Sequence, residues 1–162
     1  MNILTPDTET TRSWHETFAR QTNHLVWDIL SKPERTQAED EGMVHAAHAS
    51  RYHWEEVGTP THLTRGDWLL SHVYAVLNQP QAALAYATSC LRICQQEHIG
   101  DFDLAYAYEA MARAYAALGQ KSQCDHYYQL AQEAGDNIQN IEPEDKDIFF
   151  DDFRNGPWFG LK

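Results

Sequence analysis

The chain is poor in basic residues: its 162 residues include 12 lysines and arginines against 24 aspartates and glutamates, which gives a formal net charge of −12. Binding to nucleic acids and binding to an anionic membrane surface both depend on clustered lysine and arginine. The sequence also lacks any run that approaches the roughly 18 apolar residues of a membrane-spanning helix. These absences argue against a nucleic-acid partner and against a membrane partner.

Cysteine is scarce, and a secretion signal is lacking. The first residues, MNILTPDTETTRSW, have neither the basic start nor the apolar core of a signal peptide. The three cysteines, Cys90, Cys94 and Cys124, are an odd number and form no CxxC motif. A structural zinc site needs a better set of ligands than these. We therefore expect buried free thiols and a cytoplasmic location.

Motifs of common enzyme classes are also missing. The sequence contains no GxSxG, P-loop, GxGxxG or HExxH motif, and no ExxH pairs of the kind found in di-iron bundles. Asp101 and Asp103 flank Phe102 and could form an acid–base pair, but carboxylates are also expected in the first turn of a helix as caps and dipole partners. The sequence favours a protein that is not an enzyme, and we expect no cofactor.

What the sequence does contain is the pattern of one globular, all-α domain over residues 1–162. Apolar residues make up 43% of the chain and include five tryptophans and eight tyrosines. After a flexible polar tail at residues 1–11, apolar residues recur at helical spacing. The predicted helices cover residues 12–31, 38–57, 61–77, 80–97, 102–118 and 122–134. The first is expected to pack through Trp14, Phe18, Gln21, Leu25 and Ile29, and the second through Met43, Ala47, Ser50, Trp54 and Val57.

The C-terminal segment, residues 142–162, has a different composition. Acidic residues surround Ile148, Phe149, Phe150 and Phe153. Because the last unit of a helical array must shield its exposed core, we expect a short seventh helix that caps the open end, held down by the run from Pro157 to Phe159. The alternative is a detachable docking segment.

A helical hairpin is repeated in the middle of the chain. Its two short turns, Asn78-Gln79-Pro80 and Gly119-Gln120-Lys121, lie 41 residues apart. A repeat of this length is typical of helical solenoids. The pattern therefore predicts an antiparallel array of α-hairpins.

These hairpins, residues 62–135, resemble tetratricopeptide (TPR) units. If Leu70 and Met111 occupy the large apolar position of a first TPR helix, the small positions of each unit fall on Ser71, Ala83 and Cys90, and on Ala112, Cys124 and Ala131. The period exceeds the usual 34 residues, Ser71 replaces the unit glycine, and the proline after a standard unit is missing. The resemblance implies a right-handed superhelix with a concave groove. Phrases such as RGDWLLSHVYAVL and GDFDLAYAYEAMARAYA are also similar to an uncharacterised bacterial family, which implies no activity.

The first helix of each hairpin carries two stripes, an apolar packing stripe and a second one in which aromatic residues lie beside charged ones. At 100° per residue, one stripe consists of Leu63, Gly66, Leu70, Val73 and Leu77, and its counterpart of Leu104, Tyr108, Met111, Tyr115 and Leu118. Roughly opposite lie Arg65, Trp68 and His72 in one helix, and Phe102, Tyr106, Glu109 and Arg113 in the other. The TPR resemblance implies that the concave groove is lined by Arg65, Trp68, His72, Tyr106, Glu109 and Arg113.

This set supports more than one interpretation. Arginine would hold a carboxylate bidentately, and Trp or Tyr would supply a stacking surface, so the groove could bind a peptide or a small anionic ligand. Alternatively, Glu109 and Arg113 form an ordinary i,i+4 pair, and Trp68 and Tyr106 pack against the first helix or against a second subunit.

Histidines cluster on the second predicted helix and invite a metal-site interpretation. Geometry argues against three ligands from this helix, since His48 and His53 point roughly 140° apart and His45 and His53 roughly 80° apart. Two could contribute if His24 or His72 came from a neighbouring helix, an arrangement similar to DinB-like bundles, although no motif of that family is matched. His48 and Arg51 share one flank, where they extend the groove or, as we favour, form a polar seam between helices.

The sequence thus leads to three functional hypotheses. The first is a non-catalytic cytoplasmic scaffold that binds a protein, a peptide or a small anionic ligand in a concave groove. The second is a helical bundle that holds a metal or small ligand through histidines, with hydrolase activity as one option. The third is a homodimer in which the aromatic stripe serves only as the interface.

Overall fold

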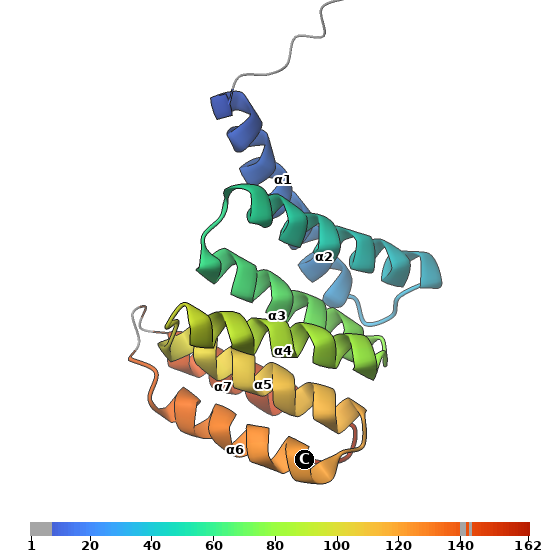
Figure 1. Cartoon of the computed structure of the whole chain (residues 1–162). Coiled ribbons are helices and arrows are strands. Elements are labelled where there is room, and N and C mark those ends of the chain that lie inside the picture. Colours follow the sequence, from blue (N-terminus) through green and yellow to red (C-terminus); the bar gives the residue numbers. More distant parts are fainter. Residues whose placement is uncertain (1–7, 140–141, 143) are drawn as a thin grey trace, which may run out of the picture.

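The computed structural model describes residues 8–139, 142 and 144–162, and every regular element in this part of the chain is an α-helix (Figure 1). The predicted all-α fold is confirmed. The helices are α1 (Thr8–Leu30), α2 (Gln37–Val57), α3 (Pro60–Val76), α4 (Pro80–Gln96), α5 (Asp101–Ala117), α6 (Lys121–Asp136) and α7 (Asp145–Asn155). Helix α1 begins four residues earlier than predicted, so residues 8–11 of the expected tail are helical. Residues 1–7 of that tail lie outside the described residues.

Consecutive helices pack side by side from α1 to α6, as a helical repeat requires. Helix α3 also lies against α5, whereas within the described chain the backbone of α1 packs along α2 alone. The turn residues Asn78 and Gly119, which are 41 residues apart, both have left-handed backbones, with φ of 53° and 70°. Asparagine and glycine tolerate this conformation best. The two hairpins therefore turn in the same way at equivalent positions.

Small residues allow the middle helices to pack closely. The predicted small positions Ala83, Cys90, Cys124 and Ala131 are all at most 1% exposed. Helix α5 is buried around almost its whole circumference, through six alanines at positions 105, 107, 110, 112, 114 and 116. The three cysteines are buried free thiols, as predicted. Because of this packing, the faces of α3 and α5 that lie opposite their apolar packing stripes contact other parts of the chain instead of solvent.

The predicted packing face of α1 is confirmed at Ile29 and wrong at the other four residues. Trp14, Phe18 and Leu25 are 46–50% exposed, and the buried residues of α1 are Ala19, Val26 and Ile29. The backbones of α1 and α2 approach closely at Ala19, whose carbonyl oxygen accepts a hydrogen bond of 2.9 Å from Ser50 Oγ. A small residue is needed at such a crossing, so the larger side chains lie beside it; the ring of Phe18, for example, lies 5.6 Å from that of His53 of α2.

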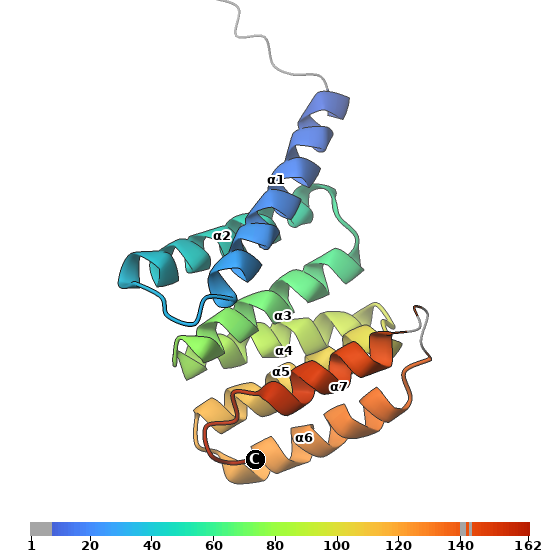
Figure 2. The same ribbon diagram turned by 180° about the vertical axis from the view of Figure 1, so that it is seen from behind.

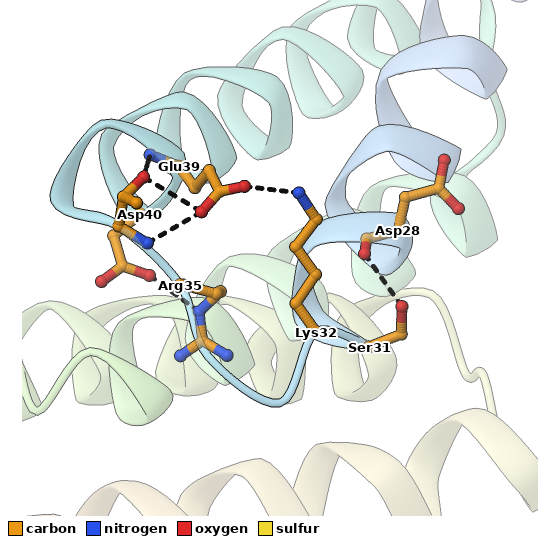
Figure 3. Close-up of polar contacts among 7 residues, drawn as sticks. Asp28, Ser31, Lys32, Arg35, Glu39 and Asp40 are labelled. Atoms are coloured by element: carbon orange, nitrogen blue, oxygen red, sulfur yellow. Dashed lines mark hydrogen bonds and ion pairs between the residues drawn. The ribbon is translucent and has the colours of Figure 1, made fainter.

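The connection between α1 and α2 is held by polar contacts (Figure 3). Thr36 and Glu39 form a capping box at the start of α2, Lys32 pairs with Glu39, and Arg35 Nε donates to Asp40 Oδ1 at 2.8 Å. The hydrogen bond from Lys32 is the main cause that lowers the pKa of Glu39 to about 2. These contacts hold the C-terminal end of α1, which carries Trp27, in a defined position relative to the start of α2.

The predicted seventh helix is present as α7, which packs on α5 and α6. Figure 2 shows it in front of α5, on the side of the array where α1 lies in front of α2. Phe149, Phe153 and Trp158 are buried at this contact, and Trp158 Nε1 donates to the carbonyl oxygen of Phe153 at 2.9 Å. Gly135 of α6 is essential to the fit, because a Cβ atom there would lie 2.3 Å from Phe149 Cε1.

Candidate binding site

A pocket of about 300 Å³ opens between α1, α3, α5 and α7. This volume is at the lower end of the range for sites that bind small molecules. Its floor contains Thr64, Leu69 and Cys90, and its walls and rim are formed by Asn23, Trp27, Arg65, Trp68, Phe102, Asp103, Tyr106, Ile148 and Asp152. The pocket exists because α1 diverges from α3, which leaves space that side chains only partly fill.

Four aromatic rings contribute to the lining of this space. Trp27 of α1 stacks on Trp68 of α3, with ring centroids 6.0 Å apart and planes at 25°. Trp68 meets the edge of Tyr106 at 5.0 Å, and Tyr106 meets Phe102 at 4.8 Å. Trp27 remains 42% exposed. The result is a continuous aromatic wall that is accessible from one side.

Charged groups occupy the rim of the pocket. Arg65 donates from Nε to Asp103 Oδ1 at 2.6 Å and from Nη2 to Oδ2 at 3.1 Å, and this pairing raises the pKa of Arg65. Across the pocket, the Tyr106 hydroxyl donates to Asp152 Oδ2 at 2.6 Å. Burial and the nearby Asp152 raise the pKa of Tyr106, so its hydroxyl stays protonated. The rim therefore carries two carboxylates and one guanidinium, and the guanidinium is already paired.

The same face of α3 and α5 continues into a buried polar cluster. Glu109 and Arg113 form an i,i+4 ion pair and are 1% and 2% exposed. Trp68 Nε1 donates to Glu109 Oε2 at 2.9 Å, and Arg113 Nη1 donates to His72 Nδ1 at 3.1 Å. Each of these two bonds joins residues 41 positions apart. Equivalent positions of the two hairpins thus face one another directly.

The C-terminal segment completes this cluster. Arg113 also donates to the carbonyl oxygen of Gly156, and its guanidinium lies 5.3 Å from the ring centroid of Trp158. Burial, reinforced by Arg113, lowers the pKa of His72 to about 3, so His72 is neutral and its Nδ1 is free to accept. Burial raises the pKa of Glu109, while Arg113 acts in the opposite direction. The Glu109 and Arg113 side chains are thus buried, while a second hollow of about 270 Å³ borders the cluster and is lined in part by Trp27, His72 and Gly156.

The structure places the predicted groove residues in three locations. Arg65, Trp68 and Tyr106 line the pocket. His72, Glu109 and Arg113 form the polar cluster beneath the C-terminal segment. His48 and Arg51 lie away from both groups and belong to a polar seam between α2 and α3, the interpretation that the sequence favoured. His48 Nε2 bonds to the Tyr74 hydroxyl at 2.8 Å, and Arg51 Nε donates to Asp67 Oδ1 at 2.7 Å.

Several pocket residues were missed by sequence reasoning. Trp27 lies off the predicted packing stripe of α1. A tryptophan on a face that was expected to meet solvent was the signal that could have indicated a further contact or a site there. Ile148 and Asp152 are four residues apart on α7 and reach the pocket because α7 lies against α5. No local pattern indicates that contact, since Tyr106 and Asp152 are 46 residues apart in sequence.

Most of the residues considered for metal binding or catalysis have other partners. Among the described residues, no group of three or more His, Cys, Asp or Glu side chains is placed to hold a metal ion. His53 Nδ1 lies 2.9 Å from His15 Nδ1. Gly100, and not one of the two aspartates, is the N-cap residue of α5, and Asp101 accepts a hydrogen bond from the backbone N–H of Gln139 at 2.9 Å. Asp103 is engaged by Arg65.

The chain matches no protein-family model, no curated protein and no solved structure. Within the part of the chain that the structure describes, no helix is both long and apolar enough to cross a membrane.

Proposed function

We propose that this protein is a non-catalytic, TPR-like scaffold that binds a peptide segment of a protein partner by holding one partner side chain in the pocket between α1, α3, α5 and α7. The observation that carries the proposal is the aromatic wall formed by Trp27, Trp68 and Phe102. Accessible aromatic rings in a concave site supply much of the binding energy in peptide recognition, because they bury a large area at little cost in conformational entropy.

The TPR-like part of the proposal is supported by the register of the two hairpins. Trp68 bonds to Glu109 and His72 bonds to Arg113, each across one repeat of 41 residues. The turns at Asn78 and Gly119 have the same backbone conformation. Two stacked units of one repeat account for both observations.

The charges at the rim favour a peptide over the small anionic ligand that the sequence suggested. Arg65 contributes the one guanidinium among the described lining residues, and Asp103 binds it through both carboxylate oxygens. An incoming anion would have to compete with Asp103 and would also meet Asp152. The pocket is therefore better suited to an apolar, aromatic or cationic side chain.

The test compares two tryptophans on the same helix. Trp27 and Trp14 are 42% and 50% exposed, but only Trp27 belongs to the described pocket lining. The full chain would be screened against a positional-scanning library of blocked hexapeptides, and the selected peptides titrated against both variants. Trp27→Ala should weaken binding by about 30-fold, as expected for loss of an aromatic anchor, while Trp14→Ala should bind as the wild type does. Equal affinities for Trp27→Ala and wild type would refute the proposal.

A second candidate function, self-association, is supported by a different surface. Trp14, Phe18 and Leu25 are each nearly half exposed and lie within about 40° of one another around α1. Exposed apolar stripes of this kind often mark contacts between subunits. Sedimentation velocity should then show a dimer that Trp14→Ala converts to a monomer. A monomeric wild type would eliminate this candidate without affecting the first.

A further inference from the structure

The rim of the pocket carries an excess negative charge. Arg65 and Asp103 neutralise each other through two hydrogen bonds, which leaves Asp152. Asp152 Oδ2 accepts from the Tyr106 hydroxyl, and Oδ1 forms no hydrogen bond with any described residue. Asp152 is exposed, so a partner can approach it. The whole chain has a net charge of −12, and its field would guide a basic segment towards this rim.

The walls suit a flat cation. A guanidinium is planar and weakly hydrated, and it stacks on aromatic faces, whereas an ammonium group is compact and strongly hydrated. The chain already uses such contacts on this face: the guanidinium of Arg65 lies 5.9 Å from the ring centroid of Phe102, and that of Arg113 lies 5.3 Å from Trp158. Ile148, 47% exposed at the same rim, offers an apolar surface for an aliphatic stem.

We propose that the side chain held in this pocket is an arginine of the peptide partner, with its guanidinium paired to Asp152 and its plane against the rings of Trp27 and Trp68. This inference rests on the proposed function and names the partner's chemistry. A bidentate pair between arginine and carboxylate is among the stronger polar contacts in proteins. Asp152 has one oxygen available, so we expect one direct bond supplemented by stacking.

The test uses blocked pentapeptides of one sequence, Gly-Ser-X-Ser-Gly, in which X is arginine, citrulline or lysine. Citrulline has the shape of arginine without its charge. The full chain would be titrated with each peptide while the indole signals of Trp27 and Trp68 are followed by NMR. We expect the arginine peptide to bind about 10-fold more tightly than the citrulline peptide, as a single charge-assisted contact predicts.

Two neighbouring aspartates of α7 provide a matched pair of variants. Asp152→Asn removes the proposed counter-ion but keeps an oxygen that can accept from Tyr106. Asp151→Asn makes the same charge change at an exposed residue whose partner is Arg154, at 2.5 Å. Asp152→Asn should abolish the preference for arginine over citrulline, and Asp151→Asn should preserve it.

The outcomes separate this inference from the proposed function. Equal binding of arginine and citrulline, equal effects of the two variants, or binding of lysine as tight as that of arginine would each overturn the arginine inference while peptide binding stands. Ethylguanidine that binds as tightly as the arginine peptide would show that the ligand is a free guanidine and not a peptide. If no selected or synthetic peptide shifts the signals of Trp27 and Trp68, the proposed function fails as well.

Discussion

The face shared by α3 and α5 has a closed end, the polar cluster around Arg113, and an open end, the pocket beside Arg65. The two arginines differ in burial and in the number of their partners. At the closed end Arg113 is 2% exposed and is bound to Glu109, His72 and the carbonyl oxygen of Gly156. At the open end the side chain of Arg65 is 60% exposed and is paired with Asp103 alone among the described carboxylates. The buried guanidinium of Arg113 thus has several hydrogen-bond and ion-pair partners. The exposed guanidinium of Arg65 has one, and the aromatic rings beside it remain accessible.

This difference arises from how far each neighbouring element reaches. The C-terminal segment covers the closed end because α7 lies against α5 and α6. The other end stays open because the backbone of α1 packs along α2 and not along α3, while the ring of Trp27 reaches Trp68 across the gap. A buried ion pair requires nearly complete satisfaction, so the closed end has a structural role, and the open end is the part available to a partner.

The largest expected effect comes from breaking the closed end. Glu109→Ala leaves the buried charge of Arg113 without its carboxylate, and the free energy of unfolding should fall by about 3–5 kcal/mol. Asp103→Ala at the open end should cost no more than about 1 kcal/mol, because that pair is solvated on the arginine side. Urea denaturation of both variants measures the difference. Similar losses for the two would contradict the division into a closed and an open end.

The next effect comes from loosening α7. Gly135→Ala places a Cβ atom 2.3 Å from Phe149 Cε1, and overpacking of this kind costs about 1–3 kcal/mol. Gly42→Ala is the matched control, since it is also a helical glycine but has no atom within 4 Å of a new Cβ. It should be neutral or stabilise the protein by up to about 1 kcal/mol. Thermal unfolding measures both, and hydrogen exchange should show faster exchange in residues 145–155 of Gly135→Ala only.

A further effect concerns the pH dependence of stability at the closed end. The pKa of His72 lies at about 3 in the folded protein, against an ordinary value of 6.5. The unfolded chain therefore takes up a proton below pH 6.5 that the folded protein refuses until about pH 3, so this residue lowers stability progressively as the pH falls through that window.

His72→Asn tests this contribution. The Asn Oδ1 atom can accept from Arg113 as Nδ1 does, but it does not titrate. The free energy of unfolding should consequently fall less steeply between pH 6.5 and 4 in His72→Asn than in the wild type. Parallel pH profiles for the two proteins would show that His72 is not held neutral at the closed end.

The smallest effect on stability is expected at the rim of the pocket. Tyr106→Phe removes the hydrogen bond to the exposed Asp152 and should cost about 1 kcal/mol. Calorimetry of this variant should show a change smaller than that for Gly135→Ala. A loss as large as that of Glu109→Ala would mean that the rim is structurally as important as the closed end.

The sequence predicts the helices well because their signals are local. Helical spacing and the residues at the turns, such as Pro60, Asn78 and Gly119, place five of the first six helices to within two residues at each end. The double stripe on α3 and α5 also indicates that Trp68 and Tyr106 face something other than solvent. Both side chains line one pocket, while peptide binding there stays a prediction.

The rest of the site depends on contacts that local patterns do not encode. Two faces of α1 about 100° apart carry comparable apolar residues, and the close crossing at Ala19 decides between them. That choice sends Trp27 to the pocket and leaves Trp14 exposed. The position of α7 depends on the fit of Phe149 against Gly135, which links two segments that only the folded structure brings together.

The central claim is that the open end of the face shared by α3 and α5 binds a partner while the closed end is structural. Its most direct test is a crystal structure of the full chain with a peptide selected from the library. We predict a partner side chain against Trp27 and Trp68, with α7 still packed on α5 and α6. A peptide that instead replaces α7 on α5 and α6, or that lies along Trp14 and Phe18, would contradict this account.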